Sequence, residues 1–175
     1  MRAPKTDNQL LRLIARGDES AFAELFDRHA DWCQRVARRF APDTHLAADA
    51  VQEALLYLLD AAGTLDAPAG IRPWLYAVVR HRALATARPG KREQSETDRA
   101  EIEPHADTEL HADLSRAVMA LSEPLREALL LRVVDSLSVR ETAMALAIAE
   151  GTVKSRLSAA LAELRGVPNL KRYFE

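Results

Sequence analysis

Basic and aromatic side chains are interleaved in one stretch of the sequence from which acidic residues are absent. Between residues 67 and 92 the charged side chains are six cations: Arg72, Arg80, Arg82, Arg88, Lys91 and Arg92. Trp74 and Tyr76 lie among them. Such cations contact phosphates, and exposed rings stack on unpaired bases at about 1–3 kcal/mol each. The stretch therefore predicts binding of a single nucleic-acid strand. The alternative is that the rings pack in the core and the arginines are only solvated.

A second polar set lies near the end of the chain, in a helix expected over residues 150–165. Its apolar residues recur at helical spacing: Val153, Leu157, Ala160 or Leu161, and Leu164. Its opposite face carries hydroxyls and cations: Thr152, Lys154, Ser155, Arg156 and Ser158. Upstream, Ser138 and Glu141 form a capping box, and residues 147–149 form a tight turn with Ile148 pointing inward. This order predicts a helix-turn-helix that enters the major groove. Any helical hairpin with a polar face remains the alternative.

A third set shares one face of a helix expected over residues 46–60. Asp49, Gln52, Glu53 and Leu56 stand at i, i+3, i+4 and i+7. An acidic face beside an apolar residue can dock a basic partner surface. From the spacing alone, an ordinary solvated face is the favoured interpretation.

Residues that could hold a metal or perform catalysis are scarce. His29 and Cys33 are four apart on one helix, but both lie on its apolar stripe, so we expect a core histidine and a core thiol. The single cysteine excludes an internal disulfide. The sequence offers no nucleophile–base pair and no phosphate-binding glycine loop. We therefore expect no enzyme, no metal and no cofactor.

The elements that must position these sets are predicted to be helical. Hydrophobic residues make up 48% of the chain and aromatic residues only 5%, and alanine and leucine predominate, which favours an all-α protein. The first half predicts helices over about 7–17, 20–40 and 46–60, with a fourth from Pro73. In the second half, a helix with Pro124 in its first turn has this predicted buried stripe: Leu125, Leu129, Leu130 and Val133.

Charge divides the chain. Residues 91–110 hold 3 basic and 7 acidic side chains, a net −4, which predicts a flexible acidic linker between two small helical domains, residues 1–90 and 111–175. Apolar runs fall short of the ~18 residues that span a bilayer. The start, MRAPKTDNQL, lacks the apolar core of a signal peptide. We expect a soluble, cytoplasmic protein without membrane insertion.

Two runs of residues resemble a known family. The run from Leu121-Ser-Glu-Pro-Leu-Arg through Ser138 to Gly151-Thr-Val-Lys-Ser-Arg-Leu is similar to the C-terminal domain of extracytoplasmic-function (ECF) sigma factors. Ala48-Asp-Ala-Val-Gln-Glu-Ala and Trp74-Leu-Tyr resemble that family's N-terminal domain. These proteins are small bacterial transcription initiation factors with two domains, and the resemblance covers nearly the whole chain.

The resemblance implies a role for each set and two kinds of partner. Residues 1–90 would be sigma domain two, which docks on the clamp helices of RNA polymerase's largest subunit through Asp49, Gln52, Glu53 and Leu56. The loop over 63–72 and the helix after it would bind the −10 element of promoter DNA as a single strand and capture one flipped base. The residues for this contact would be Arg72, Trp74, Arg80, His81 and Arg82. Residues 111–175 would be sigma domain four, which binds the flap of the second-largest subunit. Its helix over 150–165 would recognise the −35 element. The linker would pass toward the RNA exit channel, and an anti-sigma factor is a common partner.

Five positions depart from the family pattern. His81 replaces the usual Asn and Ala85 the usual Asp, which predicts an unusual −10 preference. Ala159 stands where Arg is frequent, so a phosphate contact is expected to be lost and −35 binding weakened. Ser136 and Ala147 stand where Gly is common, and a left-handed backbone there would cost roughly 1 kcal/mol each.

Two other functions fit parts of the pattern. A response-regulator-type activator would share the Thr-Val-Lys helix, but residues 1–90 lack the strands of its receiver domain. A protein-interaction module could use both domains to sequester a partner without touching DNA. Binding to a promoter fragment with and without core polymerase discriminates among the three.

Overall fold

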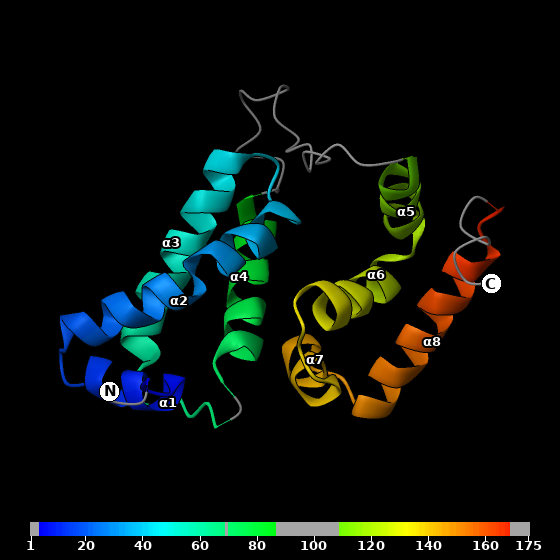
Figure 1. Ribbon diagram of the computed structural model, residues 1–175. Coiled ribbons are helices and arrows are strands. Elements are labelled where there is room, and N and C mark those ends of the chain that lie inside the picture. Colours follow the sequence, from blue (N-terminus) through cyan, green and yellow to red (C-terminus); the bar gives the residue numbers. More distant parts are fainter. Residues whose placement is uncertain (1–3, 69, 87–108, 169–175) are drawn as a thin grey trace. The chain divides into compact units, whose positions relative to one another are not determined.

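The structure is a computed structural model that describes residues 4–68, 70–86 and 109–168 (Figure 1). Regular structure in these ranges is helical throughout, which confirms the predicted all-α class. The chain divides into two units, residues 1–100 and 101–175. Most of the linker expected over 91–110, including Lys91 and Arg92, lies outside the described residues, as does Arg88; only its last two positions are described, where a helix begins at Glu109.

In its described residues, the first unit contains four helices: α1 (Asp7–Ile14), α2 (Glu19–Arg38), α3 (Thr44–Ala61) and α4 (Arg72–Thr86). A side chain before each of the first three accepts a hydrogen bond from a first-turn amide, which satisfies a donor that the helix leaves unpaired. These caps are Thr6, Asp18 and Asp43. Thr6 also forms a capping box with Gln9, and Asp18 starts α2 slightly earlier than the sequence predicted.

The core of the first unit lies where α2 packs against α3 and α4, with α1 against α2 (Figure 1). Its fully buried large side chains include Leu10, Leu11, Leu25, Leu58, Ile71, Leu75, Tyr76 and Val79. The ring of Tyr76 is only 1% exposed and meets Phe40 edge-on at 6.3 Å. Tyr76 is therefore a core residue, and of the two rings in the basic stretch only Trp74 is partly accessible.

The second unit consists of α5 (Glu109–Ala120), α6 (Glu123–Leu129), a π-helical turn η1 (Leu130–Val134), α7 (Val139–Leu146) and α8 (Glu150–Gly166). Both α6 and α7 pack on α8. One buried cluster joins α5, α6 and α8: Ala117, Leu121, Leu129, Ala160 and Leu164. Ala160 is buried and Leu161 is 38% exposed, so Ala160 is the residue that completes the inner face of α8.

The predicted position of Val133 in the buried stripe is wrong. Its side chain is 65% exposed, whereas Leu131 is fully buried. The cause is η1, because a π-turn adds a residue to the turn and shifts the side chains after it away from the α-helical register. Leu131, three residues after the buried Ala128, occupies the inward position instead.

Candidate functional site

The helix α3 exposes the acidic face that the sequence predicted. Asp49, Gln52, Glu53 and Leu56 are all exposed, and the Leu56 side chain is 56% accessible. The other side of α3 is buried against α2 and α4 through these residues: Ala47, Ala50, Val51, Ala54, Leu55 and Leu58. Since packing fixes the rotation of α3, the four residues must share one outer surface, which we call the α3 surface.

A cluster of two stacked aromatic rings and one guanidinium group lies next to the α3 surface, on its α4 side. Tyr57 stacks on Trp74 with ring centroids 5.7 Å apart and an angle of 12° between the planes. The guanidinium of Arg82 lies 5.7 Å from the Tyr57 centroid and 3.6 Å from a Glu53 carboxylate oxygen. The structure thus brings Glu53, predicted for docking, next to Arg82 and Trp74, predicted for strand binding. Sequence analysis missed Tyr57, although its place four residues after Glu53 puts it beside that residue on α3.

Two further arginines of α4 lie over aromatic rings of other segments. Arg72 lies 5.3 Å above the Trp32 ring, and Arg80 lies 5.3 Å from the Phe40 ring. Cation–π contact fixes each guanidinium and leaves both side chains half-buried. His81 is exposed on the same helix. Of the predicted strand-binding residues, Arg72, Trp74, Arg80 and Arg82 are therefore held by neighbouring rings, which prearranges them.

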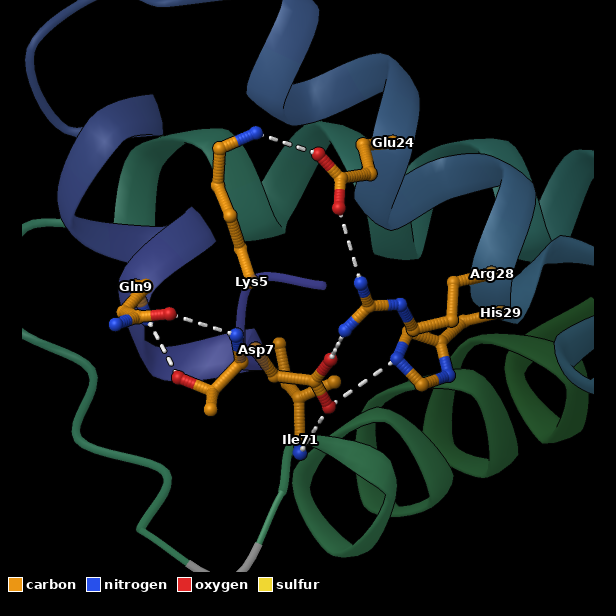
Figure 2. Close-up of polar contacts among 8 residues, drawn as sticks. Lys5, Asp7, Gln9, Glu24, Arg28, His29 and Ile71 are labelled. Carbon is orange, nitrogen blue, oxygen red and sulfur yellow. Dashed lines mark hydrogen bonds and ion pairs between the residues drawn. The ribbon is translucent and has the colours of Figure 1, made fainter. Parts of the chain in front are cut away.

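The loop between α3 and α4 contacts the start of α1. The Asn8 amide nitrogen donates to Asp66 Oδ1 at 2.8 Å, and the Ala67 backbone amide donates to Asn8 Oδ1 at 3.3 Å. Asp7 Oδ2 accepts from the Ile71 backbone amide at 3.2 Å, immediately before α4 (Figure 2). Residues about sixty positions apart in the sequence are thus joined by short polar side chains.

Asp7 is also the centre of a charged network with α2. Arg28 Nη1 lies 2.8 Å from Asp7 Oδ1, and His29 Nε2 lies 3.2 Å from Asp7 Oδ2 (Figure 2). Burial raises the pKa of Asp7, but the hydrogen bonds from His29, Ile71 and Arg28, together with the charge of His29, outweigh it and lower that pKa to about 2. Glu24 joins the network by accepting from both Arg28 and Lys5.

The predicted core assignments of His29 and Cys33 agree with their burial. His29 is 4% exposed and Cys33 is fully buried. Burial raises the pKa of the Cys33 thiol to about 12, despite the opposing charge of Arg72. Within the part of the chain that the structure describes, no group of three potential ligands could hold a metal ion. None of the helices in that part is long and apolar enough to cross a membrane.

The helices α7 and α8 adopt the predicted helix-turn-helix arrangement. Ser138 and Glu141 form the capping box that starts α7. Ala147 ends it in the left-handed conformation, at φ 53° and ψ 44°, and Ile148 is half-buried beyond it. Ser136, before α7, is also left-handed at φ 56°, so both positions hold the left-handed backbone at which replacing glycine is expected to cost stability.

The helix α8 presents most of its predicted polar residues to solvent. Thr152, Lys154, Ser155 and Ser158 are exposed, and Arg156 is half-buried. Ala149 precedes α8 in the N-cap position and offers no side-chain hydrogen bond, so the first-turn amides lack a side-chain cap. The Thr152 and Val153 amides donate to the Ala149 carbonyl instead, and the exposed side chains of Thr152, Lys154 and Ser155 supply further donors at this end of α8.

Both units match known protein families. A family model described as Sigma-70 region 2 matches residues 25–93, and one described as Sigma-70, region 4 matches residues 111–164. The ECF RNA polymerase sigma factor SigM of Mycobacterium tuberculosis is 32% identical over 167 residues, which are 93% of this chain and 85% of that protein. The RNA polymerase sigma-E factor of Streptomyces coelicolor is 33% identical over 153 residues, 85% of this chain and 86% of that protein.

Two solved structures share the fold. CnrH in complex with the cytosolic domain of CnrY has a TM-score of 0.69 and 22% identity, and the match covers 93% of this chain and 96% of that chain. The sigma factor RpoE from Bartonella quintana, in complex with the anti-sigma factor NepR, has a TM-score of 0.64 and 21% identity. That match covers 83% of this chain and 94% of that chain.

Proposed function

Because the chain belongs to the ECF RNA polymerase sigma factors, we propose that it acts through three surfaces to direct core polymerase to promoters. The α3 surface docks on core polymerase, the α3–α4 loop with α4 holds the −10 element, and α8 recognises the −35 element. The protein performs no covalent chemistry of its own and acts in the cytoplasm. The observation that carries the proposal is that each unit buries its own core while leaving these residue sets accessible.

Recognition of the −35 element is assigned to α8, which would lie in the major groove of duplex DNA. Its support is the accessible row of Thr152, Lys154, Ser155 and Ser158, in a helix held from behind by α6 and α7. Hydroxyls and cations at this end can bond base edges and phosphates. Arg156, half-buried beside this row, would contact a phosphate.

Capture of the −10 element is assigned to the α3–α4 loop and to the exposed side of α4. Its support is the cluster of Tyr57, Trp74 and Arg82, in which two partly accessible stacked rings lie beside a guanidinium group. A flipped base gains stacking and pocket contacts that offset the cost of unstacking it. Arg72, Arg80 and His81 would contact the strand along α4.

Docking on the clamp helices of the largest polymerase subunit is assigned to the α3 surface, and docking on the flap of the second-largest subunit to the second unit. Asp49 and Glu53 supply negative charge around the exposed Leu56, which fits a basic, partly apolar partner. Once both units are held on polymerase, two weak DNA contacts act together at a high effective concentration. Neither unit alone would bind a promoter tightly.

An anti-sigma factor is proposed as a further partner. Its support is that RpoE of Bartonella quintana, which shares the fold, is in complex with the anti-sigma factor NepR. A protein that covers the α3 surface would keep this chain from core polymerase. Such a complex would be detected as loss of core binding in competition with the purified partner.

The test is promoter binding with and without core polymerase. We expect a labelled promoter fragment to be bound specifically only when core is present. Equal binding with and without core would favour a stand-alone activator, and no binding in either case would favour a sequestering module.

A matched pair of variants then tests the docking assignment. Asp49→Lys reverses a charge on the α3 surface, whereas Asp31→Lys reverses an exposed charge on α2. Both are expected to fold, since surface changes usually alter stability within about ±0.5 kcal/mol. Only Asp49→Lys should abolish core binding. Equal core affinity of the two variants would refute the assignment.

A further inference from the structure

We propose that Asp7 and Asn8, in the first turn of α1, are positioning residues for the α3–α4 loop and set how strictly it discriminates the −10 base. This inference rests on the proposed function of that loop. The two residues would not touch DNA. They would act by holding the loop backbone in the geometry that accepts one base and rejects the others.

The hydrogen bonds of Asn8 and Asp7 hold the loop at positions before Pro68 and after Gly70. On one side, Asn8 uses both ends of its amide, donating to Asp66 at 2.8 Å and accepting from the Ala67 amide at 3.3 Å. On the other side, Asp7 accepts from the Ile71 amide at 3.2 Å. The two backbone amides that these side chains hold, those of Ala67 and Ile71, are four positions apart in the sequence, so α1 is bonded to the loop at both of these positions.

Among the described residues, the loop's own hydrogen bonds are short-range. The backbone amides of Thr64 and Leu65 and the Thr64 hydroxyl donate to the Ala61 carbonyl, and the Gly70 amide donates to the Ala67 carbonyl. Gly70 is in the left-handed region at φ 93°, and a Cβ built there would lie 3.7 Å from Asp7 Oδ2. A loop that must discriminate bases needs its groups held within about 0.5 Å, which requires supporting hydrogen bonds from rigid elements.

The anchor itself is rigid. The capping box of Thr6 and Gln9 fixes the start of α1, and Arg28 and His29 of α2 also bond the Asp7 carboxylate (Figure 2). The loop is therefore tied through Asp7 to the long helix α2. This arrangement differs from an ordinary helix cap, because the first-turn side chains bond a segment about sixty residues away.

The experiment measures base discrimination by the full chain bound to core polymerase. Open-complex formation is compared on promoters that carry each of the four bases at every −10 position. Asn8→Ala removes both loop bonds. We expect the ratio between the preferred base and the others to fall about five-fold at the position that the loop contacts, which is the effect of losing roughly one net hydrogen bond. Preference at the −35 element should not change.

Two further variants separate positioning from stability. Asp18→Ala removes the N-cap of α2, whose side chain bonds Ser20 and Ala21, and should lower stability without altering base discrimination. The double variant Asn8→Asp with Asp66→Asn exchanges donor and acceptor, so both loop bonds can form again. Discrimination should return in the double variant, relative to Asn8→Asp alone, in which two carboxylates face each other and the donor to residue 66 is lost.

The outcomes distinguish failure of the positioning role from failure of the proposed function. If the wild-type complex discriminates the −10 bases and Asn8→Ala discriminates equally well, the positioning role is overturned while the proposed function stands. If Asn8→Ala behaves as Asp18→Ala does, the contacts are structural only and the proposal fails. If the wild-type complex with core polymerase has no −10 preference at all, both the proposed function and the positioning role fail.

Discussion

Replacing Ala147 by glycine should stabilise the second unit. Ala147 adopts φ 53° and ψ 44° at the end of α7, where its Cβ carries the strain of the left-handed region. That strain is roughly 1–2 kcal/mol for a residue with a Cβ. Glycine avoids it but adds about 0.4–1 kcal/mol of backbone freedom to the unfolded chain. The balance is a stabilisation of about 0.5–1 kcal/mol.

The assay must report on the second unit alone. Trp32 and Trp74 both lie in the first unit, so tryptophan fluorescence follows that unit and should not change. Hydrogen exchange of the α7 and α8 amides follows the second unit. We expect their protection factors to rise about two- to five-fold in Ala147→Gly, which is the stated free energy expressed as a ratio.

A matched control variant should change the stability of the second unit in the opposite direction. Ala159 lies exposed in the middle of α8, where the backbone is right-handed, so Ala159→Gly should cost about 1 kcal/mol and lower the same protection factors. If Ala147→Gly also lowers protection, or leaves it unchanged, the left-handed turn carries no strain that glycine relieves. The reasoning for Ser136 would then fail as well.

Three other perturbations have definite expected results. The pKa of Asp7 is lowered from 3.8 to about 2, so the ionised carboxylate contributes fully to the free energy of unfolding above pH 3.8, and this contribution is lost as the pH falls toward 2. Asp7→Asn should remove this pH dependence and lower the free energy of unfolding by about 2 kcal/mol at neutral pH. Urea unfolding followed by tryptophan fluorescence measures both effects. An unchanged acid profile in Asp7→Asn would contradict the network. Ala159→Arg should add a phosphate contact, so promoter affinity of the polymerase complex should rise and the salt slope steepen by about one, and a slope equal to wild type would exclude the contact. The Cys33 thiol, whose pKa is raised to about 12, should resist alkylation at pH 8 until urea unfolds the first unit; fast labelling of the native protein would disprove its burial.

The sequence was sufficient wherever a local pattern determines the structure. The capping box of Ser138 and Glu141, the end of α2 near residue 40 and the α3 surface all follow from residue type and helical spacing. The exposed row on α8 follows from the same periodicity. Each of these features depends on residues within about two helical turns of one another, so neighbouring residues determine them.

Features that depend on distant contacts or on irregular helix geometry were not predictable. Val133 is exposed because η1 interrupts the α-helical register, and a spacing argument assumes that register throughout. The bonds from Asp7 and Asn8 to the loop join residues 58–64 positions apart. Before the fold is known, a short polar side chain at the start of α1 indicates only a cap.

The second unit departs from local sequence preferences at three positions that precede α8 in the sequence. Ser136 and Ala147 hold left-handed backbone without glycine, and Ala149 occupies an N-cap without a capping side chain. Proteins tend to violate such rules at functional sites and to compensate elsewhere in the fold. Here the uncapped amides lie at the end of α8 that carries Thr152 and Lys154, where a phosphate could accept from them. The strained turn at Ala147 and the exposed row that begins at Thr152 are thus both close to the start of α8, the end that the proposed function assigns to the −35 element.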